Sequence, residues 1–273
     1  MDQLEGRTAV VTGAASGIGF ALARALHRAG MNVALADVDE DALRSAAESL
    51  DRSGSGVTWR RTDVSDYSQM VELAAWVKGE FGPTHVVCNN AGVDGYRGGP
   101  LWQATEADWA WTMGVNYWGV VHGVRAFLPG MLSRAEPGHI VNTASAAALT
   151  KPNNMYGITK HAVLALTEAL DAQLRAENSR IGVTALIPDL VSTPFFAKRH
   201  RHDIGAESAD DLRYGAAERA DKDALLREQG ASPDVVAARA LTAIRENQLY
   251  ALTHESSKNY LRSRTEAILG SPG

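Results

Sequence analysis

Short runs of β-branched and apolar residues alternate with alanine-rich amphipathic segments along most of the chain. The apolar runs are almost uninterrupted, which is typical of strands buried on both faces of a parallel sheet. Between them, apolar residues recur at helical spacing, and acidic residues lie near the start of the segment at residues 40–50. The pattern predicts strands at residues 7–12, 32–37, 57–62, 85–89, 139–143, 182–187 and 249–253, with helices at residues 17–29, 40–50, 68–81 and 156–176.

This alternation predicts a single α/β domain over residues 1–273, with a seven-stranded, mostly parallel, doubly wound sheet between two layers of helices. Residues 105–108 (TEAD) have the pattern of a capping box and predict a further long helix that continues toward Trp118 and beyond. The alternation breaks at about residues 194–232, a charged segment that ends in a helical pattern. Because this segment follows the carboxyl end of a strand, where open α/β sheets bind ligands, we predict a substrate lid there.

Composition narrows the class of protein. The 273 residues are 45% hydrophobic and 22% charged, which is ordinary for a globular chain long enough to bury a full core. The net charge of −5 has the wrong sign for a general nucleic-acid binder, and no run of about 18 apolar residues predicts a spanning helix. Cys88 is the one cysteine, which excludes an intrachain disulfide and favours a reducing compartment. We therefore expect a cytoplasmic protein with no nucleic-acid or membrane partner.

A glycine-rich turn joins the first predicted strand to the first predicted helix. Residues 12–19 read TGAASGIG, and glycines at 13, 17 and 19 allow a tight turn, close approach of a pyrophosphate and packing of helix on sheet. The N–H groups at the start of the helix then face the phosphates. Turns also use glycine for its φ freedom alone. The strand–turn–helix context nevertheless favours a dinucleotide site.

The GxxxGxG spacing resembles that of the short-chain dehydrogenase/reductase family, and the resemblance extends across nearly all of the chain. Residues 89–92 (NNAG), Asn116 in GVNYWG, Ser145 in IVNTAS and residues 156–160 (YGITK) resemble the family's motifs in the family's order. The resemblance implies a Rossmann fold, a nicotinamide cofactor, and hydride transfer to or from a small-molecule alcohol or ketone. It also implies a homodimer or homotetramer.

The cofactor's adenosine ribose is expected at Asp37, where a carboxylate after the second strand can accept hydrogen bonds from hydroxyls and repel a 2′-phosphate. No Arg or Lys occupies position 14, 15 or 38 to offset that repulsion, so NAD is favoured over NADP. The alternative is an ordinary acid in a strand–helix turn, since Asp39 and Asp41 follow. The resemblance implies cofactor contacts from Gly13, Ser16, Gly17, Ile18, Gly19, Asp37, Asp63, Val64, Asn89, Ala91, Gly92, Tyr156, Lys160, Pro188, Val191 and Thr193.

Tyr156 and Lys160 are four residues apart and share one face of a predicted helix. A free phenol has a pKa of about 10, and a nearby ammonium lowers it toward the range useful for proton transfer. The resemblance implies that Tyr156 is the general acid/base, that Ser145 hydrogen-bonds the substrate oxygen and that Lys160 binds the nicotinamide ribose. It further implies that Asn116 holds a water linking Lys160 to solvent.

The chain departs from the family's pattern in two places. Family members usually carry the serine about thirteen residues before the tyrosine, whereas Ser145 precedes Tyr156 by eleven; Thr143 has the usual spacing and a hydroxyl. Alignment of the IVNTAS strand favours Ser145, with a two-residue deletion after Ala148, and Thr143 stays the alternative. The family's usual Pro-Gly after the sixth strand is here Pro188-Asp189, and the role of Asp189 is left open.

Two rival functions remain. An NADP-dependent carbonyl reductase conflicts with Asp37, and a dinucleotide-sensing protein without turnover has no need of the proton donor Tyr156. On the substrate side, Tyr96, Met155, Phe195 and Phe196 favour an apolar or aromatic pocket, although aromatic residues are more often plain packing. The basic residues 198–202 (KRHRH) are either an anion-attracting cluster or a solvated face. The histidines lack metal-ligand spacing, so no metal site is expected.

Overall fold

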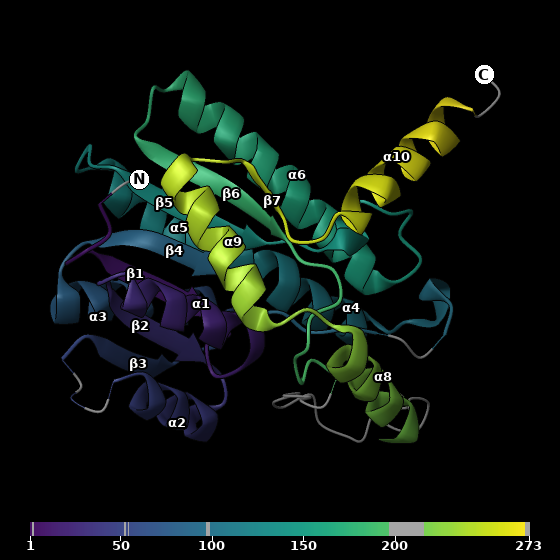
Figure 1. Ribbon diagram of the computed structural model, residues 1–273, viewed down its shortest axis with the longest axis horizontal. Helices are drawn as coiled ribbons and strands as arrows, with labels where there is room; N and C mark the ends of the chain where they lie inside the picture. Colours follow the sequence, from purple (N-terminus) through teal and green to yellow (C-terminus); the bar gives the residue numbers. More distant parts are fainter. Residues whose placement is uncertain (2, 52, 54, 97–98, 197–215, 271–273) are drawn as a thin grey trace.

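A seven-stranded sheet forms the centre of the protein (Figure 1). The computed structural model describes residues 1, 3–51, 53, 55–96, 99–196 and 216–270. Every strand pairs in parallel with its neighbours, in the order β3-β2-β1-β4-β5-β6-β7. The strands are β1 (Thr8–Thr12), β2 (Asn32–Asp37), β3 (Val57–Arg61), β4 (Thr84–Asn89), β5 (Gly138–Thr143), β6 (Ile181–Ile187) and β7 (Tyr250–Leu252). The expected parallel sheet is confirmed, and each strand end lies within one residue of its predicted place.

Helices cover both faces of the sheet. On one face α1, α2 and α9 pack against the strands, and on the other face α3, α5 and α6 do so (Figure 1). None of the described helices has both the length and the apolar character needed to cross a bilayer. The helices are α1 (Gly17–Arg28), α2 (Glu40–Leu50), α3 (Tyr67–Phe81), α4 (Glu106–Met113), α5 (Gly119–Leu132), α6 (Met155–Ala176), α8 (Ala216–Gln229), α9 (Pro233–Glu246) and α10 (Ser256–Leu269).

Local signals explain where most of these helices begin. A side chain accepts a backbone N–H in the first turn of α2, α3, α4, α6 and α9, which removes one unpaired donor at each helix start. Thr105 and Asp108 form the expected capping box, each side chain accepting the other residue's N–H. The capping side chains are those of Asp39, Asp66, Thr105, Asn154 and Ser232.

The helix that the capping box opens runs on to Leu132 but changes its hydrogen-bond pattern on the way. A π-helical turn, η2 (Gly114–Trp118), separates α4 from α5, and the Gly119 N–H donates to the Gly114 carbonyl five residues earlier. The predicted helix that continues beyond Trp118 is therefore confirmed, with a π-helical turn that was not predicted. Extra residues in a turn of this kind widen the helix locally, and such turns often lie at functional sites. Asn116 is in the middle of this turn and is fully buried.

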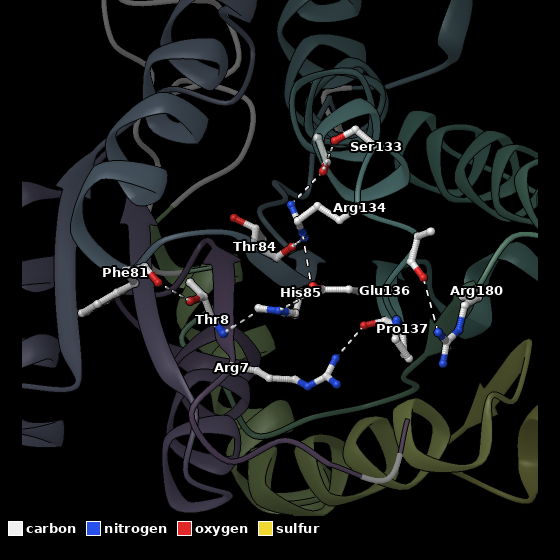
Figure 2. A network of polar contacts seen from close by, with 12 residues as sticks. Arg7, Thr8, Phe81, Thr84, His85, Ser133, Arg134, Glu136, Pro137 and Arg180 are labelled. Carbon is white, nitrogen blue, oxygen red and sulfur yellow. Dashed lines mark hydrogen bonds and ion pairs between the residues drawn. The ribbon is translucent and has the colours of Figure 1, made fainter.

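The amino ends of the strands are tied together by polar side chains (Figure 2). The register between β1 and β4 shifts at Thr8, and there the Thr8 N–H donates to Nδ1 of His85 at 3.2 Å. The imidazole thus replaces a backbone acceptor of the ladder, which requires Nδ1 to be unprotonated. Burial, together with the charges of Arg7 and Arg134, lowers the pKa of His85 and keeps the ring neutral.

Three arginines close the same edge of the sheet by donating to carbonyl oxygens at the start of β4, just before β5 and in the last turn of α5 (Figure 2). Bonds of this kind from a charged donor are stronger than neutral ones. The bonds join Arg7 to Pro137 (2.7 Å), Arg134 to Thr84 (2.5 Å) and Gly130 (2.7 Å), and Arg180 to Ala135 (3.4 Å). The network cross-links four segments that are far apart in the sequence.

Candidate active site

A cavity of about 620 Å³ opens at the opposite edge, beyond the carboxyl ends of the strands. This is the place where open α/β sheets bind ligands, because the loops that follow the strands diverge there. The turn after β1, the ends of β2 and β3, the start of α6 and the segment after β6 all contribute to its walls. Of the residues expected in the site, it is lined by Gly13, Ser16, Gly17, Ile18, Gly19, Asp37, Asp63, Val64, Ala91, Gly92, Ser145, Tyr156, Lys160, Pro188, Val191 and Thr193.

The glycine turn presents backbone amides to this cavity. Ser16 is the N-cap of α1, and its side chain makes no capping hydrogen bond, unlike the caps of α2, α3, α4, α6 and α9. Gly13 and Gly17 have φ of 65° and 56°, and a Cβ on Gly19 would lie 2.0 Å from the Gly13 carbonyl oxygen. Glycine is therefore required sterically at these positions. An anionic group such as a pyrophosphate fits against the start of this helix.

Asp37 is held rigidly at the end of β2. Its Oδ2 accepts the N–H of Ala15 at 3.0 Å, and its Oδ1 accepts the N–H of Asp39 at 3.2 Å. A carboxylate oxygen has more than one acceptor position, so both oxygens can still accept hydroxyl hydrogens from a ligand. A fixed negative charge at this wall of the cavity also repels a phosphate.

The two asparagines that follow β4 have different surroundings. Asn90 lines the cavity, where its Nδ2 donates to the Thr12 carbonyl at 3.0 Å and its Oδ1 accepts the Thr143 hydroxyl at 3.2 Å. Asn89 is 2% exposed, lies outside the cavity lining and donates from Nδ2 to Oδ1 of Asn142 at 2.9 Å. The sequence predicted that Asn89 contacts the cavity, but the residue that lines it is Asn90. The NNAG motif alone contains no signal that distinguishes the two residues.

Asn116 lies outside the cavity lining and joins two of the walls. Its Oδ1 accepts the Val93 N–H at 2.8 Å, while its Nδ2 donates to the Val93 carbonyl at 2.9 Å and to Oγ1 of Thr159 at 3.1 Å. The Thr159 hydroxyl in turn donates to the Tyr156 carbonyl at 2.7 Å. The side chain of Asn116 therefore fixes the segment after β4 against the first turn of α6. Its expected role in holding a water stays a prediction.

Tyr156 and Lys160 both reach the cavity from the first turns of α6. Lys160 is 3% exposed; its Nζ donates to the Thr143 carbonyl at 2.9 Å and lies 5.5 Å from the centre of the Tyr156 ring. Burial lowers the pKa of Lys160 to about 8. A buried ammonium beside a phenol favours the phenolate form, so this pair is suited to proton transfer near neutral pH.

Ser145 and Thr143 both line the cavity, but their hydroxyls are engaged differently. The Thr143 hydroxyl donates its hydrogen to Asn90. The Ser145 oxygen caps the short 3₁₀ helix η3 (Ala146–Ala148) by accepting the Ala147 N–H at 3.1 Å, which leaves its hydrogen to be donated elsewhere. This difference supports Ser145 as the hydroxyl that contacts a substrate oxygen.

Backbone hydrogen bonds join the two ends of the expected lid, one near residue 192 and the other at residue 231. The Ser192 N–H donates to the Ala231 carbonyl, and the Ala231 N–H donates to the Leu190 carbonyl, both at 2.9 Å. A Cβ on Gly230 would lie 2.5 Å from the Ser192 nitrogen, so glycine permits this approach. Residues 197–215 of the predicted lid, including the basic residues 198–202, lie outside the described residues. Within the described ranges, no three His, Cys, Asp or Glu side chains gather as metal ligands.

Comparisons with known proteins agree with this geometry. A family model for short chain dehydrogenase matches residues 7–203. A 1-deoxy-11-beta-hydroxypentalenate dehydrogenase of Streptomyces avermitilis is 42% identical over 193 residues, covering 70% of this chain and 71% of that protein. A short-chain dehydrogenase/reductase from Burkholderia phymatum, solved in complex with NAD, is 38% identical with a TM-score of 0.88, covering 98% of this chain and 96% of that one.

A third similar protein widens the range of cofactors. A metagenomic short-chain oxidoreductase solved in complex with NADP is 25% identical, with a TM-score of 0.69, and covers 92% of this chain and 96% of its own. Similar structures therefore bind nicotinamide dinucleotides of both kinds. With the fold, the cavity and the family match in agreement, the chain belongs to the short-chain dehydrogenase/reductase family of oxidoreductases.

Proposed function

We propose that the protein is an NAD-dependent alcohol dehydrogenase that interconverts a secondary alcohol and the matching ketone. The main observation behind this proposal is that Tyr156, Lys160, Ser145 and the glycine turn all line the same cavity. A similar protein named as a dehydrogenase of a hydroxylated compound supports the reaction class.

The residues of the cavity fit a nicotinamide dinucleotide. The uncapped amides of the glycine turn would bind its pyrophosphate, Asp37 its adenosine ribose and Lys160 its nicotinamide ribose. The bound nicotinamide supplies the hydride acceptor for oxidation and the hydride donor for reduction. Glycine at positions 13, 17 and 19 is needed for contacts within the protein, and it also leaves no side chain between the turn and a ligand.

The protein's own groups handle the proton. In oxidation, Tyr156 accepts the hydroxyl proton while the carbon loses a hydride, so alcohol and NAD⁺ yield ketone, NADH and one proton. In reduction, Tyr156 donates that proton to the carbonyl oxygen. Ser145 donates a hydrogen bond to the same oxygen and orients it. Lys160 favours the ionised phenol, and Asn116 would hold a water through which the proton reaches solvent.

Asp37 is the basis for proposing NAD rather than NADP. Both of its oxygens are fixed by backbone N–H groups, so the carboxylate cannot readily turn away from a 2′-phosphate. We expect Asp37→Ser to lower the ratio of kcat/KM with NAD to kcat/KM with NADP by about tenfold or more, since each factor of ten needs only about 1.4 kcal/mol. Wild-type preference for NADP would contradict this assignment.

The proposed chemistry is tested by absorbance at 340 nm with NAD or NADP across a panel of secondary alcohols. Tyr156→Phe should lower kcat by about 10²- to 10⁴-fold, because it removes the acid/base group, while NAD binding is retained. Undiminished turnover by Tyr156→Phe would overturn its role. Tight NAD binding by the wild type without turnover of any alcohol would instead favour a dinucleotide sensor.

We further propose a homodimer or homotetramer in the cytoplasm. The aromatic side chains of Trp102 and Trp118 are 83% and 47% exposed, which favours a partner surface near α4 and α5. Light scattering during size-exclusion chromatography gives the mass of the assembly, and a value near 29 kDa would contradict an oligomer.

A further inference from the structure

The part of the cavity beside Tyr156 offers mainly apolar surface to a substrate. Two of the polar side chains that line the cavity already make hydrogen bonds within the protein. Oδ1 of Asn154 accepts the Gly157 N–H at 2.8 Å, and Oδ2 of Asp189 accepts the Ser256 hydroxyl at 3.0 Å. Six apolar residues of the whole cavity lining are named the apolar wall here: Val93, Trp111, Leu190, Phe195, Phe196 and Leu226.

Within the apolar wall, Phe195 is in direct contact with Tyr156. Their ring centres are 5.7 Å apart in an edge-to-face arrangement, and the Phe196 ring follows at 5.3 Å from Phe195. A substrate oxygen that bonds the Tyr156 hydroxyl brings its neighbouring carbon groups close to these rings. Aryl or alicyclic groups gain from such contact. A polyol would instead leave several hydroxyls without partners, at a cost for each one buried.

Asp223 holds this part of the wall in place. Its Oδ1 accepts the Phe196 N–H at 3.1 Å, although the two residues are 27 positions apart. Asp223 is 4% exposed on α8, and the Lys222 ammonium on the same helix lies 6.0 Å from the centre of the Phe196 ring. The bond fixes the backbone beside Phe195, and with it the direction of that ring. Loss of the acceptor would remove this hydrogen bond from the partly buried Phe196 N–H.

We infer that the cavity selects secondary alcohols with a ring-bearing hydrocarbon body, that Phe195 determines this specificity and that Asp223 is its positioning residue. The inference rests on the proposed function in one respect, namely that the substrate oxygen bonds Tyr156. It goes beyond that function because it names the substrate class and a residue on α8 that does not line the cavity.

The test measures alcohol binding to the protein loaded with NADH, a complex in which an alcohol cannot react. Ligand-observed NMR gives the Kd of 1-phenylethanol and of sorbitol for the wild type, Phe195→Ala, Asp223→Leu and Asp223→Asn. Asp223→Asn is the matched control because its amide oxygen can still accept the Phe196 N–H. Thermal unfolding and the Kd of NADH, which should match the wild type, establish that each variant is folded. Hydrogen exchange of the Phe196 amide reports the bond itself.

The wild type should bind 1-phenylethanol at least about tenfold more tightly than sorbitol. Phe195→Ala and Asp223→Leu should each raise the Kd of 1-phenylethanol by about tenfold. The Phe196 amide should exchange faster in Asp223→Leu. In Asp223→Asn both quantities should stay near the wild-type values. In turnover, Asp223→Leu should raise KM for 1-phenylethanol more than it lowers kcat.

Equal binding of sorbitol, or unchanged 1-phenylethanol binding in Asp223→Leu, would overturn the inference. A wild type that discriminates between these alcohols as expected, yet reduces no NAD with either, would overturn the proposed function and support the inference about recognition.

Discussion

The two edges of the central sheet are built from the same strands and differ in what their polar groups do. At the amino edge, Arg7 and Arg134 donate to carbonyls, and His85 accepts a ladder N–H (Figure 2). At the carboxyl edge, Lys160 is buried beside a large cavity with its pKa lowered to about 8. At the amino edge, charged side chains give hydrogen-bond partners to backbone carbonyls. At the carboxyl edge, a charged side chain lies where burial disfavours its charge. The contrast separates groups that stabilise the fold from groups that we propose perform chemistry.

The largest effect should come from Lys160→Met. We expect kcat/KM to fall by about 10²- to 10⁴-fold, because the ammonium no longer favours the Tyr156 phenolate. The unfolding midpoint should stay level or rise, since burial disfavours the charged amine in the folded state. Activity assays and thermal unfolding at pH 7 measure the two quantities. A large loss of stability in this variant would remove the contrast between the edges.

The second effect is expected at the amino edge, where a substitution should lower stability and leave activity unchanged. Arg134→Met should lower the free energy of unfolding by about 2–3 kcal/mol, because the carbonyls of Thr84 and Gly130 lose a charged donor. At the same time kcat/KM should stay within about twofold of the wild type, since the residue is remote from the cavity. Arg262→Met on the exposed helix α10 is the control and should unfold like the wild type. Urea unfolding gives these values.

The third effect is loss of stability in acid. Burial lowers the pKa of His139 from 6.5 to about 3, and the pKa of His85 is lowered as well. Between the folded and unfolded pKa values the unfolded chain binds more protons, so the free energy of unfolding falls as pH drops below about 6.5. The stabilising contribution is fully present above that pH.

His85→Asn isolates the share of His85 in this acid sensitivity. The amide oxygen can replace Nδ1 as acceptor of the Thr8 N–H and does not titrate. Stability of this variant, measured by urea unfolding between pH 7 and 5, should decline less steeply than that of the wild type, because the pKa of His85 is lowered in the folded state. An identical decline would show that His85 does not contribute.

The smallest effect should come from Ser256→Ala at the carboxyl edge. This change removes the hydrogen bond to Asp189, which is partly exposed, and we expect a loss of about 0.5–1 kcal/mol with kcat altered less than about threefold. Urea unfolding and initial rates measure both. A much larger fall in kcat would mean that Asp189 needs this bond for a role beside the substrate.

Features that depend on nearby residues could be predicted from the sequence. The capping box of Thr105 and Asp108 spans three residues, and the strands follow from short apolar runs, so both were expected correctly. The glycine turn and the positions of Tyr156 and Lys160 in the cavity are likewise consequences of local motifs on a predictable sheet.

Features that depend on distant residues could not be predicted. The contact of His85 with Thr8 spans 77 positions, and that of Asn90 with Thr12 spans 78, so no local pattern reports either. The π-helical turn at Asn116 also lacked a signal, because its sequence continues the helical pattern on both sides. Helices α9 and α10 were not anticipated, although Ser232 and Pro233 are a recognisable start for α9. Only the packed structure selects among such possibilities.

The paired backbone bonds at residues 190–192 and 231 have a consequence for how this enzyme family can diversify. Because the chain leaves and returns at one point, the intervening segment is a cassette whose length and composition can change without moving β6 or α9. The family model's match ends at residue 203, inside that cassette. Grafting the corresponding segment of a relative between Ser192 and Gly230 is therefore a route to transferring substrate preference while Tyr156 and Lys160 on α6 stay in place.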